Sequence, residues 1–68
     1  MGLLHDDGKT LYEFEAALKH ETEQAYLIFD GAQDIWLPKS QTTMERDDPK
    51  QLPTFLIPEW LALEKGLI

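Results

Sequence analysis

The sequence contains no cysteine, so its 68 residues hold neither a disulfide framework nor a cysteine-based zinc site. No apolar run approaches the roughly 20 residues needed to span a bilayer. Residues 1–7 lack both the basic region and the long apolar region of a signal peptide, and we expect none. A chain without these features suits a reducing compartment, so we expect the protein in the cytoplasm.

Basic residues are scarce. Six Lys and Arg residues stand against thirteen Asp and Glu residues, giving a net charge of −7, and residues 1–34 hold eight of the acids and two of the bases. Such a surface repels nucleic-acid phosphate and anionic membrane and attracts basic partners. The same acidity also keeps a small protein soluble, with no binding role at all. We therefore expect no direct nucleic-acid binding and no membrane binding.

The length predicts a single domain over residues 1–68, with a small core because a chain of this size buries only about 60% of its unfolded surface. Residues 1–9 show no periodicity, which predicts an irregular lead-in. Residues 45–52 are charged and contain a proline, which predicts a solvent-exposed loop. A short helix is predicted over residues 58–66, because a proline stands at its start and Gly66 follows Lys65 at its end.

A hairpin is predicted at the centre of the chain. The apolar run Ala25–Phe29 is followed by turn residues Asp30 and Gly31, and a second apolar run resumes at 35–37 before Pro38. Two short apolar runs around a glycine-containing loop are typical of a hairpin. The first run is apolar on both faces, so we expect it in the middle of its sheet.

Residues 10–21 fit two structures. Read as a helix, they begin with a capping box at Thr10 and Glu13. Read as a strand, their apolar residues fall on one face and their charged residues on the other. We predict a strand, because the context of a neighbouring sheet overrides helix propensity. The apolar positions of this alternation are Tyr12, Phe14, Ala16 and Leu18.

These elements predict an α+β fold: a small antiparallel sheet, or a partly open barrel, of three to four strands closed by a short C-terminal helix. Residues 53–57 supply the last strand, and residues 41–44 are a candidate extension of the hairpin beyond a bend at Pro38.

No residue pattern predicts catalysis, a metal or a cofactor. Ser40 beside Lys39 suggests a Ser–Lys dyad, but no glycine-rich turn accompanies it for an oxyanion hole. His5 stands beside two aspartates, yet adjacent side chains seldom converge on one ion, and His20 is distant in the sequence. Glu13 and Glu15 resemble paired carboxylates, but nothing apolar surrounds them to raise a pKa, so a solvated face explains them better.

Trp36 and Trp60 are the largest side chains of the sequence. We expect both in the core, because a domain of this size needs every large ring for burial. We accordingly expect truncation of Trp60 to unfold the domain. An exposed tryptophan would instead mark a contact site, because this residue is enriched at interface hot spots.

Two segments carry a resemblance: Trp-Leu-Pro-Lys-Ser-Gln at 36–41, and Pro-Glu-Trp-Leu at the start of the predicted C-terminal helix. Over residues 14–68 the chain resembles short, mostly uncharacterised proteins of phages and mobile elements. More loosely, its size and acidity resemble phage inhibitors of host defence, of the anti-CRISPR and anti-restriction type. This resemblance implies a non-enzymatic protein in the cytoplasm of a bacterial host, and it carries no catalytic residues.

We therefore predict an inhibitor that docks an acidic face on a basic, nucleic-acid-binding surface of a host protein or nuclease complex. The alternative is a structural or adaptor protein that uses an apolar surface near Trp36 or Trp60 for assembly. The predicted partner-binding residues are the carboxylates of the first half: Glu13, Glu15, Glu21, Glu23, Asp30 and Asp34.

Overall fold

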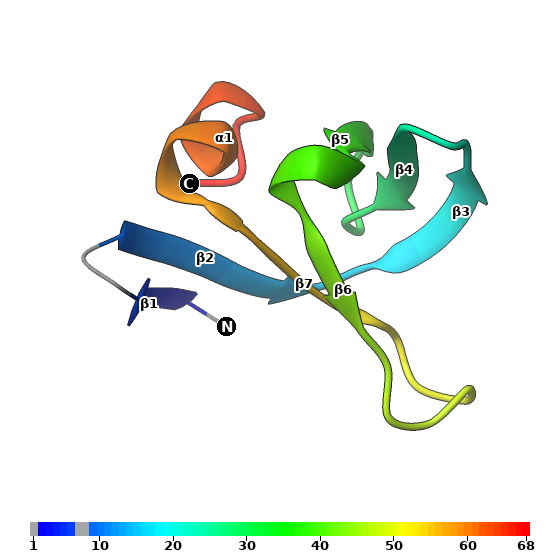
Figure 1. The fold of residues 1–68 in the computed structure, drawn as a ribbon. Helices are drawn as coiled ribbons and strands as arrows, with labels where there is room; N and C mark the ends of the chain where they lie inside the picture. Colours follow the sequence, from blue (N-terminus) through cyan, green and yellow to red (C-terminus); the bar gives the residue numbers. More distant parts are fainter. Residues whose placement is uncertain (1, 7–8) are drawn as a thin grey trace.

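The structure is a computed structural model that describes residues 2–6 and 9–68, with side chains from Thr10 onward (Figure 1). Its strands are β1 (Gly2–Asp6), β2 (Lys9–Glu15), β3 (Ala17–Glu21), β4 (Ala25–Phe29), β5 (Asp34–Pro38), β6 (Thr43–Glu45) and β7 (Thr54–Pro58). A 3₁₀-helix, η1 (Lys39–Gln41), follows β5, and an α-helix, α1 (Glu59–Glu64), follows β7. The predicted α+β class is confirmed.

The strands form two antiparallel sheets rather than one. The four-stranded sheet has the order β1-β2-β7-β6, and the three-stranded sheet has the order β3-β4-β5. β2 and β3 are consecutive parts of one extended stretch that leaves the first sheet and enters the second at Ala16 (Figure 1). Hydrogen bonding does not close the strands into a ring, so the barrel alternative is not confirmed. β4 lies between β3 and β5, as predicted for the middle of a sheet.

The extended stretch confirms the strand interpretation of residues 10–21, and the helical alternative is wrong. Phe14 and Ala16 are buried, whereas Glu15 between them is exposed. Tyr12 and Leu18 are partly buried and pack against the same core. The alternation of side chains along a strand explains this pattern, and the bend at Ala16 lets one stretch line both sheets.

Phe55 of β7 joins the two sheets at the centre of the core. Its side chain is fully buried, and its ring centroid lies 5.7 Å from Phe14 of β2 and 5.9 Å from Tyr26 of β4. Aromatic pairs at such separations add stabilisation beyond area burial. The other buried residues of the core come from both sheets and from α1: Ile28, Ile35, Leu37, Ile57, Leu61 and Ala62.

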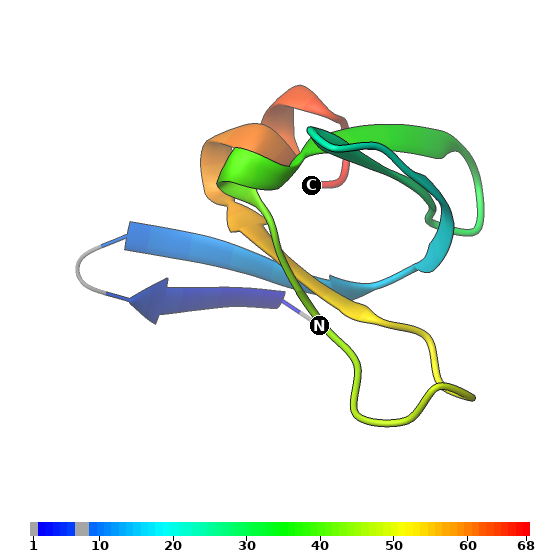
Figure 2. The same cartoon turned by 45° about the vertical axis from the view of Figure 1, so that its right-hand side comes forward.

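Helix α1 covers this core at one end, as Figure 2 shows. Gly66 adopts a positive φ of 77°, and the N–H groups of Gly66 and Leu67 donate to the carbonyls of Leu63 and Ala62 at 3.2 and 2.8 Å. This pair of bonds is a Schellman motif, so the predicted helix end is confirmed. Pro58 precedes the helix as its N-cap residue. None of the described helices is long and apolar enough to cross a membrane.

The expectation that both tryptophans lie in the core is wrong. Trp36 is 44% exposed and Trp60 is 55% exposed. Ile35 and Leu37 are buried on β5, so the residue between them points away from the core. In α1 the buried residues are Leu61 and Ala62. Trp60 precedes Leu61, so its side chain is rotated by about 100° around the helix axis and points towards solvent.

Two connecting segments also differ from their predictions. Residues 1–9 were expected to be irregular, but Gly2–Asp6 pair with β2 as strand β1; residues 1, 7 and 8 lie outside the described residues. Residues 41–44 were a candidate extension of the hairpin, but η1 intervenes and β6 pairs with β7 in the other sheet. The Thr42 hydroxyl donates to the Pro38 carbonyl at 2.8 Å, which fixes this change of direction.

The charged loop is confirmed after Glu45, the last residue of β6. Residues 46–52 form no helix or strand and are exposed. Within the loop, the Asp48 carboxylate accepts a hydrogen bond from the Lys50 N–H at 2.9 Å.

Candidate protein-binding surface

The outer face of the three-stranded sheet carries apolar and aromatic side chains. Ile28 and Ile35 of paired strands point into the core, so their neighbours along β4 and β5 point outward. Leu27 pairs directly with Trp36, and His20 of β3 pairs with Leu27. We call this surface the aromatic face and define it by the residues that share it: His20, Leu27, Phe29 and Trp36.

The large rings of the aromatic face remain in contact with water. Phe29 is 38% exposed and Trp36 is 44% exposed. The His20 and Trp36 rings meet edge to face at a centroid distance of 6.5 Å, which holds the indole against the sheet. A rigid tryptophan on a strand loses little conformational entropy on binding, so it is a suitable anchor for a partner.

One ion pair borders the aromatic face: the Lys19 ammonium lies 3.3 Å from the Asp34 carboxylate and 5.7 Å from the centre of the Phe29 ring. A second ion pair lies on the core-facing side of the same sheet, because Glu21 pairs with Tyr26. There the Lys39 ammonium pairs with the Glu21 carboxylate and lies 5.0 Å from the centre of the Tyr26 ring. Both lysines therefore have partners within the protein.

The turn between β4 and β5 is held by Asp30. Its Oδ1 atom accepts hydrogen bonds from the N–H groups of Ala32 and Gln33 at 2.8 and 2.9 Å, and Gly31 supplies a φ of +103°. These hydrogen bonds, the one from the Ala32 N–H first and the one from the Gln33 N–H second, hold the pKa of Asp30 below its ordinary value of 3.8. The ionised carboxylate thus has a structural role in the hairpin that carries the aromatic face.

Four of the six predicted partner-binding carboxylates lie around the three-stranded sheet. Glu21 ends β3 and Glu23 follows it in the β3–β4 turn. Asp30 and Asp34 lie at the opposite end of β4, in the turn and at the start of β5. Three of these four already contact other groups of the protein, and Glu23 is the one without a contact among the described residues.

The structure separates the other two predicted carboxylates from this group. Glu13 and Glu15 lie on the outer face of the four-stranded sheet, paired with Leu56 and Thr54 of β7. Glu45 of β6 pairs with Thr54 from the other side, so it shares this face. We had not predicted Glu45, because only the strand register reveals that it belongs beside Glu15. No ion pair of these three side chains forms within the described ranges.

The sequence analysis also missed the aromatic face, although a signal was present. Residues 25–29 are apolar at every position, and a strand with one buried face needs apolar side chains at only half of them. We attributed the extra apolar residues to burial on both faces. In the structure one face packs on the core and the other is open.

The candidate groups for catalysis and metal binding do not assemble in the described part. Ser40 is exposed in η1, and its neighbour Lys39 pairs with Glu21. Among the described side chains, no three His, Asp or Glu residues gather as metal ligands would. The side chains of His5, Asp6 and Asp7 lie outside the described residues.

Comparison of the chain with family models, with curated proteins and with solved structures found no match. The geometry of the two sheets and of α1 is therefore the basis on which we infer a function.

Proposed function

We propose that this chain is a non-enzymatic protein-binding module that docks its aromatic face on a basic surface of another protein. The observation that carries this proposal is the exposure of Phe29 and Trp36 on one side of a sheet whose other side forms the core. Large apolar groups gathered on the surface of a small domain mark an interaction site.

The chemistry of the aromatic face matches the usual anatomy of an interface. Phe29 and Trp36 are 38% and 44% exposed, so covering each ring removes less than half of the about 150–250 Å² that a fully exposed ring buries. At about 25 cal/mol per Å² this is about 2 kcal/mol per ring before the costs of association. The centre of the face, from Leu27 to Trp36, carries no charge, and the Lys19–Asp34 ion pair lies on its border. An apolar centre with a polar rim is what stable protein–protein contacts require.

Charge selects the kind of partner. Four carboxylates and two ammonium groups lie around the three-stranded sheet, so its surroundings are net acidic, and the whole chain carries −7. Such a surface accelerates encounter with a basic protein surface and disfavours direct contact with nucleic acid. Basic protein surfaces with apolar patches occur where proteins hold nucleic acid, so competition with nucleic acid is the expected mode of action.

The resemblance to phage proteins gives this proposal its specific form. In that form the partner is a host nucleic-acid-targeting defence complex, the protein inhibits it in the manner of anti-CRISPR proteins, and the site of action is the bacterial cytoplasm. The carboxylates around the three-stranded sheet supply the electrostatic part, and Trp36 and Phe29 supply the apolar anchor.

A second candidate function is structural: a phage or adaptor protein that assembles through the same apolar surface. The exposure of Trp36 favours it, because apolar docking does not require a basic partner. The two functions differ in their dependence on salt. Charge-assisted docking weakens steeply as salt rises, whereas apolar assembly does not.

The test is capture of host proteins with three immobilised forms of the chain: wild type, Trp36→Ala and Trp60→Ala. Trp60 is the matched control, since it is at least as exposed as Trp36 (55% against 44%) but lies on α1. We expect a partner retained by wild type and Trp60→Ala, lost with Trp36→Ala, and displaced by salt and by nucleic acid. Retention of the same proteins by Trp36→Ala would refute docking through the aromatic face.

A further inference from the structure

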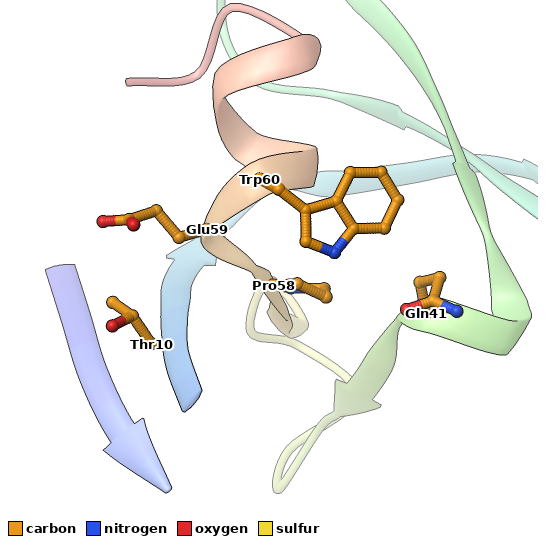
Figure 3. A pocket seen from close by; sticks show the side chains of 5 residues that line it. All are labelled: Thr10, Gln41, Pro58, Glu59 and Trp60. Carbon is orange, nitrogen blue, oxygen red and sulfur yellow. The ribbon is translucent and has the colours of Figure 1, made fainter. Parts of the chain in front are cut away.

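A separate pocket lies at the start of α1, on a different part of the molecule from the residues of the aromatic face. It has a volume of about 410 Å³ and is lined by residues of β2, η1, β7 and α1: Thr10, Gln41, Pro58, Glu59 and Trp60. Figure 3 shows Trp60 and Gln41 on one side of Pro58, with Thr10 and Glu59 on the other. This volume falls within the range of about 300–1,000 Å³ that is usual for ligand sites.

Trp60 dominates the pocket and has no internal role that accounts for its position. Its ring is 55% exposed, and Leu61 and Ala62 supply the buried surface of the helix. The nitrogen edge of the indole faces Pro58 and Gln41 (Figure 3), and its N–H donates to no group of the described residues. An exposed indole with an available donor is suited to receive a ligand that brings an acceptor.

The backbone on two sides of the pocket is held in place. Pro58 has the restricted φ expected of its ring, here −62°, and it joins β7 to α1. Gln41 ends η1, whose exit is held by the bond from the Thr42 hydroxyl to the Pro38 carbonyl. Because this backbone needs no reordering on binding, a smaller part of the interaction energy is lost.

The lining groups define the ligand by what they offer and what they lack. A flat indole and a proline ring offer an apolar surface, and the indole N–H and the Gln41 amide offer hydrogen bonds. Glu59 adds a negative charge, and no Lys or Arg lines the pocket among the side chains from Thr10 onward, which disfavours a phosphate-bearing ligand such as single-stranded nucleic acid.

A polyproline II segment satisfies each of these conditions. Its proline rings pack flat against an aromatic surface, and its carbonyls make no internal hydrogen bonds and are free to accept from an indole N–H. At about 3.1 Å per residue, three to four residues of such a segment span about 10 Å, a length suited to an open pocket of this size. An adjacent basic residue complements Glu59 and the net charge of −7.

We propose that this pocket binds a short proline-containing segment of another protein in the polyproline II conformation, with an arginine or lysine next to the proline core. The pocket shares no lining residue with the aromatic face, so it binds a ligand of its own and does not contribute to the contact made through Trp36.

The experiment uses the two tryptophans separately. In a Trp36→Phe background Trp60 is the sole tryptophan, and its emission reports on the pocket directly. The probe is a synthetic peptide with an Arg-x-Pro-x-x-Pro core, compared with the same peptide carrying alanine for both prolines and with one carrying glutamate for arginine. We expect saturable binding of the first peptide and at least about tenfold weaker binding of the alanine peptide, since each tenfold step requires only about 1.4 kcal/mol.

Variants of the full chain, followed by amide chemical shifts, test the residues. Trp60→Ala should weaken binding of the proline peptide by at least about tenfold, and Trp36→Ala should leave it unchanged. Trp60→Phe keeps a ring and removes the N–H, so an intermediate loss is expected. Thermal melting of each variant separates lost binding from lost folding.

Three results would overturn the proposal: equal affinity for the proline and alanine peptides, equal binding by wild type and a folded Trp60→Ala variant, or no peptide binding at millimolar concentration. Preference of the pocket for a thymidine oligonucleotide over the peptide would also overturn it and would assign the site to nucleic acid. Failure of this site leaves the test of the aromatic face unaffected, because that test depends on Trp36.

Discussion

The outer faces of the two sheets expose different kinds of side chain. The three-stranded sheet exposes the apolar aromatic face, in which His20, Leu27 and Trp36 lie side by side on three neighbouring strands. The outer face of the four-stranded sheet is mostly polar: the partly buried Leu11 and Leu56 share it with carboxylates and hydroxyls at Glu13, Glu15, Thr43, Glu45 and Thr54. Both sheets bury their inner faces in the same core, so folding alone does not account for the difference.

A polar outer face is the ordinary solution for a sheet with one solvated side. The four-stranded sheet follows it, and its carboxylates need no explanation beyond solubility. An apolar outer face makes a small protein less soluble, and a binding partner that covers it accounts for it. The contrast therefore supports the proposal that binding uses the three-stranded sheet, although carboxylates lie on both sheets.

The largest expected effect concerns the core that both sheets share. Phe55→Ala should unfold the domain, because it removes the ring that contacts Phe14 and Tyr26 across the two sheets. Truncating a buried phenylalanine costs about 3–5 kcal/mol, which approaches the full stability of a small domain. Urea unfolding followed by circular dichroism measures this loss.

The matched control is Leu56→Ala, one position further along β7 and on the outer face of the four-stranded sheet. Leu56 is only partly buried, so its truncation should cost less than about half as much. Equal destabilisation by the two variants would show that this outer face is packed as well, and the contrast between the faces would disappear.

The second prediction separates stability from binding at Trp36. Trp36→Ala should change the free energy of unfolding by no more than about 1 kcal/mol, because the ring is 44% exposed and contacts His20 at its edge. The same variant should weaken capture of the partner at least about thirtyfold, the loss expected from an interface hot spot of about 2 kcal/mol. Urea unfolding and binding measured on the same sample decide between these roles.

Trp60→Ala should likewise leave the domain folded, which reverses the expectation drawn from the sequence.

Unfolding of Trp36→Ala at room temperature would make Trp36 a structural residue and remove the main support for the aromatic face.

Sequence reasoning succeeded where local pattern and packing agree. The alternation from Tyr12 to Leu18 predicted a strand, and the glycine at 66 predicted the helix end, because each feature depends on neighbouring residues alone. β4 was placed in the middle of its sheet correctly, although the inference behind it, burial on both faces, was wrong.

The parts that could not be predicted depend on long-range pairing. Nothing in residues 2–6 has a strand period, and β1 exists through its register with β2. Glu45 joins Glu15 only because β7 separates their strands in the sheet. Both tryptophans were wrongly expected in the core. The number of large rings in a sequence does not show which side of a strand or helix faces the core. Long-range pairing also divides the six carboxylates, which we predicted on one acidic face, between the two sheets.

A smaller effect is expected from charge on the two outer surfaces. Glu23→Lys adds positive charge at the border of the three-stranded sheet, and Glu15→Lys makes the same change on the other sheet. Both side chains are exposed, so each substitution should alter stability by less than about 0.5 kcal/mol. Glu23→Lys should slow association with a basic partner several-fold at low salt, and Glu15→Lys should slow it less, because attraction between charges falls off with distance and screening.

Association rates measured by stopped flow or on a surface with immobilised partner, at two salt concentrations, show which of the two substitutions has the larger effect. A larger effect of Glu15→Lys than of Glu23→Lys would move the docking surface to the four-stranded sheet, where Glu13 and Glu45 also lie.

The smallest expected effect is the pH dependence contributed by Asp30. Backbone hydrogen bonds from Ala32 and Gln33 lower the pKa of this carboxyl in the folded protein below its ordinary value of 3.8. A lowered folded pKa contributes stability that is present above the unfolded value and is lost as pH falls through the folded value. Wild type should therefore exceed Asp30→Ala in the free energy of unfolding near neutral pH, by less than about 1 kcal/mol because the turn is at the surface.

The difference between the two proteins should shrink as pH falls from about 5 to about 2, because protonation removes the charge that the N–H groups stabilise and leaves only a neutral acceptor oxygen. Taking the difference cancels the titration of the remaining carboxylates, which both proteins share. Urea unfolding across this range measures it, and Asp30→Asn, which keeps a neutral acceptor, should show a smaller dependence on pH. A difference that is absent at neutral pH would mean that Asp30 does not stabilise the hairpin and is available, like Glu23, to a basic partner beside the aromatic face.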